Sequence, residues 1–203
     1  MTEPKFVKAR EQLEAAFKAV YEVPQIKDEM MEEHVAETPH RSAHAIFEMF
    51  DGCFQDPVSI LDALFENTMK RYDEMIYMND ISFISTCMHH TMPFFGKAHF
   101  AYLPHVQIVG LSKIPRLVEC YAHRPQIQEQ LTMAIVDTFM EIVQPLGCGI
   151  IIEAWHFCVS VRGAKQVPAY TKTSALRGCF KDNPDTRNEF LNGVRKTTES
   201  LWP

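Results

Sequence analysis

The spacing of apolar and polar residues divides the chain into a helical first part and a mixed second part. Over residues 6–20 apolar side chains recur at helical intervals among many charged ones, which predicts an amphipathic helix. Two further helical patterns cover residues 39–50 and 58–72. We therefore predict a helical N-terminal region over residues 1–73.

Beyond residue 73 the pattern changes to one that favours strands, because β-branched and aromatic side chains become frequent. The predicted elements are strands at 76–87 and 97–109, helices at 112–124 and 126–143, strands at 149–161 and 171–180, and a last helix that begins near Pro184. This order predicts an α+β domain with an antiparallel sheet over residues 74–203.

Composition narrows the class of protein. The chain has 203 residues, of which 46% are hydrophobic and 23% charged, as is ordinary for a soluble globular domain. Its net charge of −6 argues against a nucleic-acid-binding surface, because phosphate backbones attract cationic proteins. No apolar run approaches the ~20 residues of a membrane helix, and the first residues lack the apolar core of a signal peptide. We expect a cytoplasmic protein that binds neither membranes nor nucleic acid.

The six cysteines are informative because thiols in a reducing cytoplasm are free, buried or bound to metal. The run Cys87-Met88-His89-His90 places a thiol and an imidazole three positions apart, and Cys158 adds a second thiol much later in the chain. Two thiolates and one imidazole suit zinc and leave a fourth position open, as in catalytic zinc sites. Cys87, His90 and Cys158 therefore predict a zinc site suited to hydrolysis.

Two histidines beside these ligands are candidates for proton transfer. His89 cannot easily bind the same metal as its neighbour His90, so it is free for acid–base work. On the third predicted strand, alternation puts His156, Cys158 and Arg162 on one face. An isolated histidine there is more often a core residue, but His156 lies two positions from a candidate zinc ligand. We therefore predict catalytic roles for His89 and His156.

Residues 110–116 follow a predicted strand and open a helix. Ser112 can cap that helix, and Lys113 and Arg116 share a face near its positive end. A helix N-terminus with two added cations can hold a phosphate group. A charged first turn that is simply solvated is an equally good interpretation of this segment alone.

Gln128 and Glu129 begin the next predicted helix. A carboxylate at a helix N-terminus is usually explained by its favourable interaction with the helix dipole. It could also accept two N–H bonds from a guanine edge, whose ring N–H and amino group are adjacent donors. The pattern alone favours the dipole interpretation.

Taken together, these segments resemble the zinc-dependent type I GTP cyclohydrolases over residues 80–191. The matching motifs are at residues 85–90, 110–116, 124–131, 153–158, 162–163 and 173–178, with a weaker match at 38–41. Six specific motifs in the family's order are not expected by chance. The chain departs from the family in carrying Met88 where a glutamate is usual, and its first 72 residues match only loosely.

The resemblance implies the T-fold, in which β-β-α-α-β-β units assemble side by side into a ring-shaped barrel. It also implies a homo-oligomer, since in this family two pentameric rings stack into a decamer and the active sites lie between subunits. The oligomer is the firmer implication, and its size stays open.

The resemblance further implies a role for each site residue. Zinc held by Cys87, His90 and Cys158 would supply hydroxide to attack C8 of the purine of GTP. His156 would protonate the imidazole ring of the purine, and His89 would assist proton transfers. The substrate-binding residues would be Gln128 and Glu129 for the guanine edge, Lys113, Arg116 and Arg162 for the triphosphate, Ser112 for the ribose or a phosphate, and Arg41 from a neighbouring subunit. The products would be formate and 7,8-dihydroneopterin triphosphate.

Two other interpretations stay open. A related T-fold enzyme with a partial reaction on a purine or pterin would lack part of the phosphate-binding set. A non-catalytic GTP-binding zinc assembly would lack His89 or His156. This chain keeps both sets, which favours the complete cyclohydrolase. The sequence does not indicate whether the product feeds folate, biopterin or 7-deazaguanine synthesis, or whether an allosteric regulator acts on the protein.

Overall fold

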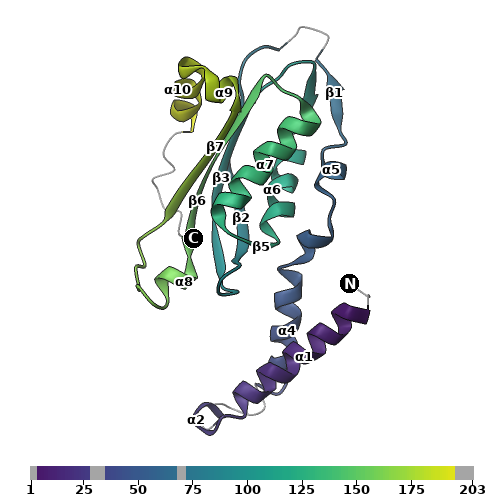
Figure 1. The fold of residues 1–203 in the computed structure, drawn as a ribbon, viewed down its shortest axis with the longest axis vertical. Coiled ribbons are helices and arrows are strands. Elements are labelled where there is room, and N and C mark those ends of the chain that lie inside the picture. The colour runs from purple at the N-terminus through teal and green to yellow at the C-terminus, as the bar shows by residue number, and fades with distance from the viewer. Residues whose placement is uncertain (1–3, 28–34, 68–71, 195–203) are drawn as a thin grey trace. The chain divides into compact units, whose positions relative to one another are not determined.

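The computed structural model of the protein describes residues 4–27, 35–67 and 72–194 (Figure 1). It divides into two compact units, Met1–Asp51 and Gly52–Pro203. The sequence predicts its boundary at residue 73, whereas the described residues from Gly52 to Asn67 group with the second unit. No helix among the described residues is long and apolar enough to cross a membrane.

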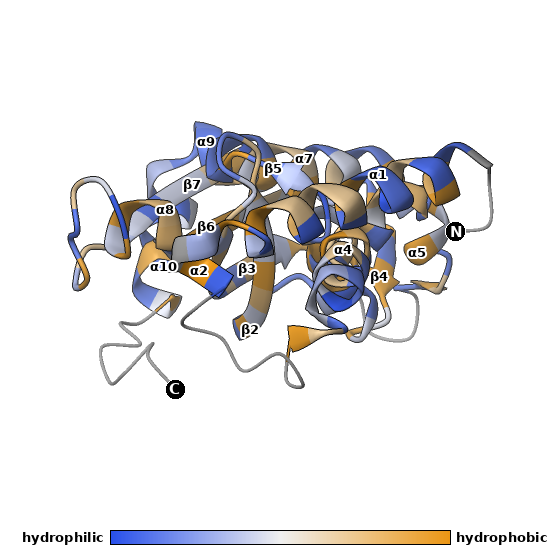
Figure 2. Ribbon diagram, turned by 90° about the horizontal axis from the view of Figure 1, so that it is seen from below, coloured by the Kyte–Doolittle hydropathy of each residue, from blue (hydrophilic) through white to orange (hydrophobic). Residues whose placement is uncertain are grey.

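The first unit is a pair of packed helices with a short extension. Among the described residues its helices are α1 (Pro4–Tyr21), α2 (Pro24–Lys27) and α4 (Thr38–Glu48). The rings of Phe6 on α1 and Phe47 on α4 meet edge to face, with centroids 6.0 Å apart. Figure 2 shows hydrophilic and hydrophobic residues mixed along α1, as an amphipathic helix requires. The helices predicted at residues 6–20 and 39–50 are confirmed.

A five-stranded sheet forms the centre of the second unit, in the order β5-β2-β3-β6-β7. Its strands are β2 (Ile76–Cys87), β3 (Pro93–Leu103), β5 (Pro125–Gln126), β6 (Gly147–His156) and β7 (Thr171–Gly178). Neighbouring strands are antiparallel except for β5, which lies parallel to β2. The predicted α+β fold with an antiparallel sheet is confirmed.

Helices cover both faces of this sheet. They are α6 (Lys113–Ala122), α7 (Gln128–Val143), α9 (Cys179–Asp182) and α10 (Pro184–Gly193). Side chains alternate along β6, so Ile150 and Ile152 join the main core with residues of α6 and α7. Ile151 points the other way and packs in a smaller core with Phe180 and Phe190 of α9 and α10. The sheet is therefore buried on both faces along much of β6.

The helix predicted over residues 58–72 is wrong for the part that the structure describes. Helix α5 (Pro57–Ile60) is a single turn, and β1 (Leu64–Glu66) pairs antiparallel with β4 (Gln107–Val109). Residues 68–71 of the prediction lie outside the described residues. Pairing with a strand distant in sequence overrides the local helical pattern, because strand formation depends on its partners.

The strand predicted over residues 149–161 ends at His156, where helix α8 (Phe157–Ser160) begins. Its pairing with β7 stops at Ala154, and its last pair with β3 joins Phe94 to His156. Without partners the chain turns, and Ser160 Oγ donates to the His156 carbonyl oxygen at 2.8 Å. The prediction that His156, Cys158 and Arg162 alternate on one strand face is therefore wrong, because Cys158 lies on a helical turn.

Candidate active site

The hairpin between β2 and β3 brings His90 back over Cys87. Cys87 is the last residue of β2 and is 6% exposed. The Cys87 carbonyl oxygen accepts from the backbone N–H groups of His90 and Thr91, at 3.3 and 2.8 Å, and Thr91 has a positive φ of 53°. This tight turn fixes the spacing of the thiol and the imidazole.

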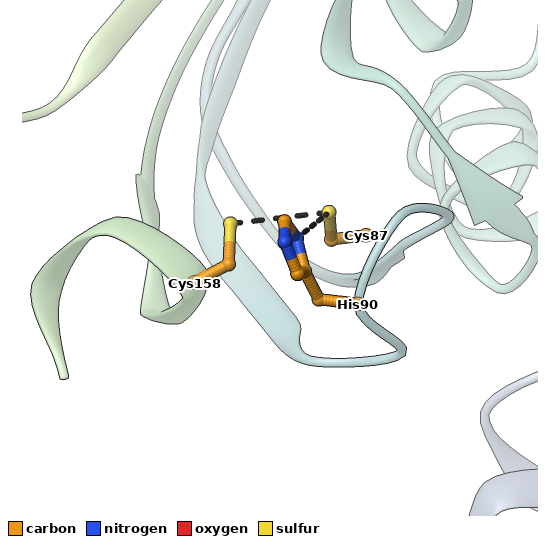
Figure 3. A group of neighbouring side chains, drawn as sticks. All are labelled: Cys87, His90 and Cys158. Atoms are coloured by element: carbon orange, nitrogen blue, oxygen red, sulfur yellow. Dashed lines mark hydrogen bonds between the residues drawn. The ribbon is translucent and has the colours of Figure 1, made fainter. Parts of the chain in front are cut away.

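Cys158 reaches the same place from helix α8, as Figure 3 shows. The Cys87 Sγ lies 3.7 Å from His90 Nδ1 and 3.9 Å from Cys158 Sγ, and the ligand atoms of all three residues lie within 4.8 Å of one another. A tetrahedral zinc ion with bonds of about 2.1–2.3 Å holds its ligand atoms roughly 3.6–3.8 Å apart. The three side chains therefore form a possible metal-binding group with a donor set and spacing that fit zinc.

The electrostatics of the two thiols favour a bound cation. Burial raises the pKa of the Cys158 thiol, and the neighbouring Cys87 thiol raises it further. The positive charge of Arg162 acts on this pKa in the opposite direction. A metal cation supplies the charge that allows two adjacent thiols to ionise together, since metal ligation requires the thiolate.

His156 lies at the end of β6 with its ring held between two neighbours. The Phe94 ring stacks on it with centroids 4.5 Å apart and an interplanar angle of 8°. The His156 Nε2 lies 2.8 Å from the Oε1 of Gln128. Burial lowers the pKa of His156, and the charge of Glu129 opposes this in part. Burial therefore favours the neutral imidazole, and the stacked ring and the amide oxygen hold its orientation.

His89 occupies the exposed side of the hairpin, with its Nδ1 3.9 Å from the Cys87 Sγ. Its ring centroid lies 6.2 Å from that of His90. His89 therefore lies beside the possible metal-binding group, of which His90 is a member, and is open to solvent.

Gln128 and Glu129 open helix α7 but face different surroundings. Gln128 is 2% exposed, and its amide nitrogen lies 3.0 Å from both the Ile152 and the Thr171 carbonyl oxygens. Glu129 is exposed. Of the two, only Glu129 has its polar group free to meet a ligand from solvent.

The residues predicted to bind phosphate differ in their surroundings. Ser112 occupies the N-cap position of α6, but its side chain makes no capping hydrogen bond, so the prediction that its side chain caps this helix is wrong. Lys113 Nζ pairs with the carboxylate of Asp62, and this pair lowers the pKa of Asp62. Arg116 and Arg162 are exposed, and Arg41 lies in the first unit.

Phe94 and Asp62 contact predicted site residues although the sequence pattern did not single them out. Phe94 lies before the strand predicted to begin at residue 97, but β3 already begins at Pro93. Strand register places Phe94 opposite His156, and that pairing leaves no local signal in the sequence.

The sheet order, the covering helices and the two-cysteine, one-histidine group define a T-fold protein with a possible metal site. The chain belongs to the GTP cyclohydrolase I family, whose model matches residues 13–195. The match includes the second half of α1 and all of α4, so much of the N-terminal unit is also part of the family likeness.

Curated relatives support the same assignment. The chain is similar to the GTP cyclohydrolase 1 of Campylobacter lari, with 46% identity over 191 residues that cover 94% of this chain and 98% of that protein. It is 47% identical to the GTP cyclohydrolase 1 of Campylobacter jejuni strain 81116 over 82% of this chain and 87% of that protein. The enzyme of Campylobacter curvus is 44% identical over 83% of this chain and 87% of its own. A solved structure of an archaeosine synthase in the apo form aligns at 12% identity with a TM-score of 0.44, over 53% of this chain and 96% of that one.

Proposed function

We propose that this protein is a GTP cyclohydrolase I, which hydrolyses GTP to formate and 7,8-dihydroneopterin triphosphate. The observation that carries the proposal is the group Cys87, His90 and Cys158, with His156 held in a fixed orientation beside it, in a member of this family. His156 precedes Cys158 by two positions, so metal and proton chemistry would meet at the end of β6.

We assign Zn²⁺ to the two thiols and the imidazole. When bound, zinc lowers the pKa of a coordinated water toward neutrality and so provides the nucleophile for purine C8. The neutral His156 can hold a proton at one nitrogen and pass it to the ring nitrogen of the opening purine. His89, which is exposed on the hairpin, would exchange protons with solvent during later steps.

The guanine edge is assigned to Glu129, because its carboxylate is exposed at the first turn of α7 and can accept two adjacent N–H groups. We assign the triphosphate to Lys113, Arg116 and Arg162, with Ser112 near the ribose. Binding of phosphate would compete with Asp62 for Lys113, since that carboxylate already pairs with it. Guanidinium groups of the two arginines suit bidentate phosphate contacts.

We further propose a homo-oligomer, in its full form a decamer of two pentameric rings. Strand β7 is an edge strand whose first residues are exposed, and such an edge is available for pairing with another chain. Arg41 would then enter the site from a neighbouring subunit. We place the protein in the cytoplasm, where two metal-binding thiols stay reduced, and we propose no membrane or nucleic-acid partner.

Product analysis tests the proposed function. The zinc-loaded protein is incubated with GTP, and formate and dihydroneopterin triphosphate are measured in the same samples. Equal amounts of both products support a complete cyclohydrolase. Formate alone would indicate a reaction that stops before ring closure, and bound GTP without either product would indicate a non-catalytic assembly.

A further inference from the structure

The side-chain amide of Gln128 has only one orientation that satisfies its partners. Its nitrogen lies 3.0 Å from the carbonyl oxygens of Ile152 and Thr171 and 3.1 Å from Thr173 Oγ1. The two carbonyl oxygens only accept hydrogen bonds, so the amide NH₂ must face them. The amide oxygen is thereby directed at His156, whose Nε2 is 2.8 Å away.

This orientation determines where neutral His156 carries its proton. An amide oxygen only accepts, so the His156 Nε2 must donate to it. The proton of the neutral ring therefore sits on Nε2, and Nδ1 keeps its lone pair. The stacked ring of Phe94, which is 0% exposed, prevents the imidazole from turning to exchange the two nitrogens.

The same contacts remove Gln128 from direct contact with substrate. The side chain is 2% exposed and both of its amide functions are engaged inside the protein. A guanine base could reach it only by breaking bonds to the backbone of β6 and β7, which would leave buried carbonyl oxygens without donors.

We propose that Gln128 is a positioning residue for His156, which holds its Nε2–H tautomer and leaves Nδ1 as the nitrogen that exchanges protons with bound purine. This inference rests on the proposed function for the identity of the purine. It reassigns Gln128 from the guanine edge, which Glu129 then reads without it.

Kinetics of the zinc-loaded protein separate the two roles. Gln128→Met keeps the length of the side chain and removes the acceptor, so we expect kcat to fall about 10- to 100-fold while the KM for GTP changes less than about twofold. The ratio of kcat/KM for GTP to that for inosine triphosphate, which lacks the 2-amino group, should stay constant. Glu129→Gln should instead raise KM and change that ratio. A raised KM with unchanged kcat in Gln128→Met would overturn the proposal.

A double-variant cycle tests whether Gln128 acts through His156. In a His156→Ala background, Gln128→Met should cause no further loss of kcat, because the group it positions is absent. Losses that multiply would show that Gln128 acts independently and would refute the positioning role. Thr138→Val is the matched control, since Thr138 lies on the same helix as Gln128 but away from His156, and this change removes its hydrogen bond to Tyr121 of α6. If Gln128→Met does not fold, Gln128→Asn serves instead, because its shorter amide cannot reach both β6 and His156.

A spectroscopic measurement keeps the inference testable without turnover. Solid-state ¹⁵N NMR of histidine-labelled protein, with His156→Ala for assignment, should show Nε2 protonated and Nδ1 unprotonated in neutral His156. Gln128→Met should abolish this preference. The opposite tautomer in the unaltered protein would overturn the inference about Gln128, whereas absence of formate from GTP would overturn only the proposed function.

Discussion

Phe94 joins the hydrophobic core to His156, so replacing it should affect both stability and turnover. Its ring meets Phe83 edge to face at 6.1 Å and stacks on His156 at 4.5 Å. Leucine keeps most of the apolar volume but loses both ring contacts, each worth about 0.5–1.5 kcal/mol. We therefore expect Phe94→Leu to lower the free energy of unfolding by about 1–3 kcal/mol, measured by thermal unfolding at fixed protein and zinc concentrations.

The effect on turnover distinguishes positioning from packing. With no ring to stack on, His156 can rotate about its side chain, so kcat for GTP should fall about 10- to 100-fold at nearly constant KM. Phe139→Leu is the matched control, because Phe139 is also fully buried and makes two ring contacts, with Phe100 and Tyr102, away from the site. If the two variants lose similar stability and keep similar kcat, the stack does not position His156.

Three further changes test separate parts of the site and fold. Cys158→Ala should leave less than stoichiometric zinc by elemental analysis and no formate release; full zinc occupancy would contradict the assigned ligand set. Arg116→Ala should weaken binding of GTP far more than of guanosine in calorimetry, and equal losses would remove Arg116 from phosphate binding. His99 is 2% exposed, and burial lowers its pKa while the charge of Asp80 opposes this. The unfolded imidazole, with a pKa of about 6.5, then binds protons more readily than the folded one. The contribution of neutral His99 to the free energy of unfolding is therefore fully present above about pH 6.5 and is lost as the pH falls below that value. His99→Gln should make the decrease in Tm with falling pH less steep.

The parts of the fold that the sequence predicts well are those whose signals are local. Strand β2 runs over residues 76–87 as predicted, since its β-branched and aromatic side chains are continuous. Helices α6 and α7 lie inside their predicted ranges because an apolar stripe at helical spacing depends only on neighbours along the chain. The three residues of the possible metal-binding group are also accessible to sequence reasoning, since few residue types bind zinc.

The errors occur where structure depends on distant partners. Strand β1 exists because β4 lies beside it, and β6 ends where β3 and β7 no longer offer pairs. The residues at 64–66 and 157–160 carry no local signal for either outcome. The helical turn that results moves Cys158 out of the strand, and in that position it lies beside Cys87.

In the first turn of α7, the structure distinguishes the roles of two adjacent residues, Gln128 and Glu129, that the sequence grouped together. Successive residues on a helix point about 100° apart, so Gln128 and Glu129 cannot face the same partner. Register of β6 and β7 places two carbonyl oxygens at Gln128, which is buried, while Glu129 stays exposed. One helical turn thus provides an inward oxygen within hydrogen-bond distance of His156 and an outward carboxylate, to which we assign the guanine base. The two roles can be tested separately, because only the effect of replacing Gln128 should depend on the presence of His156.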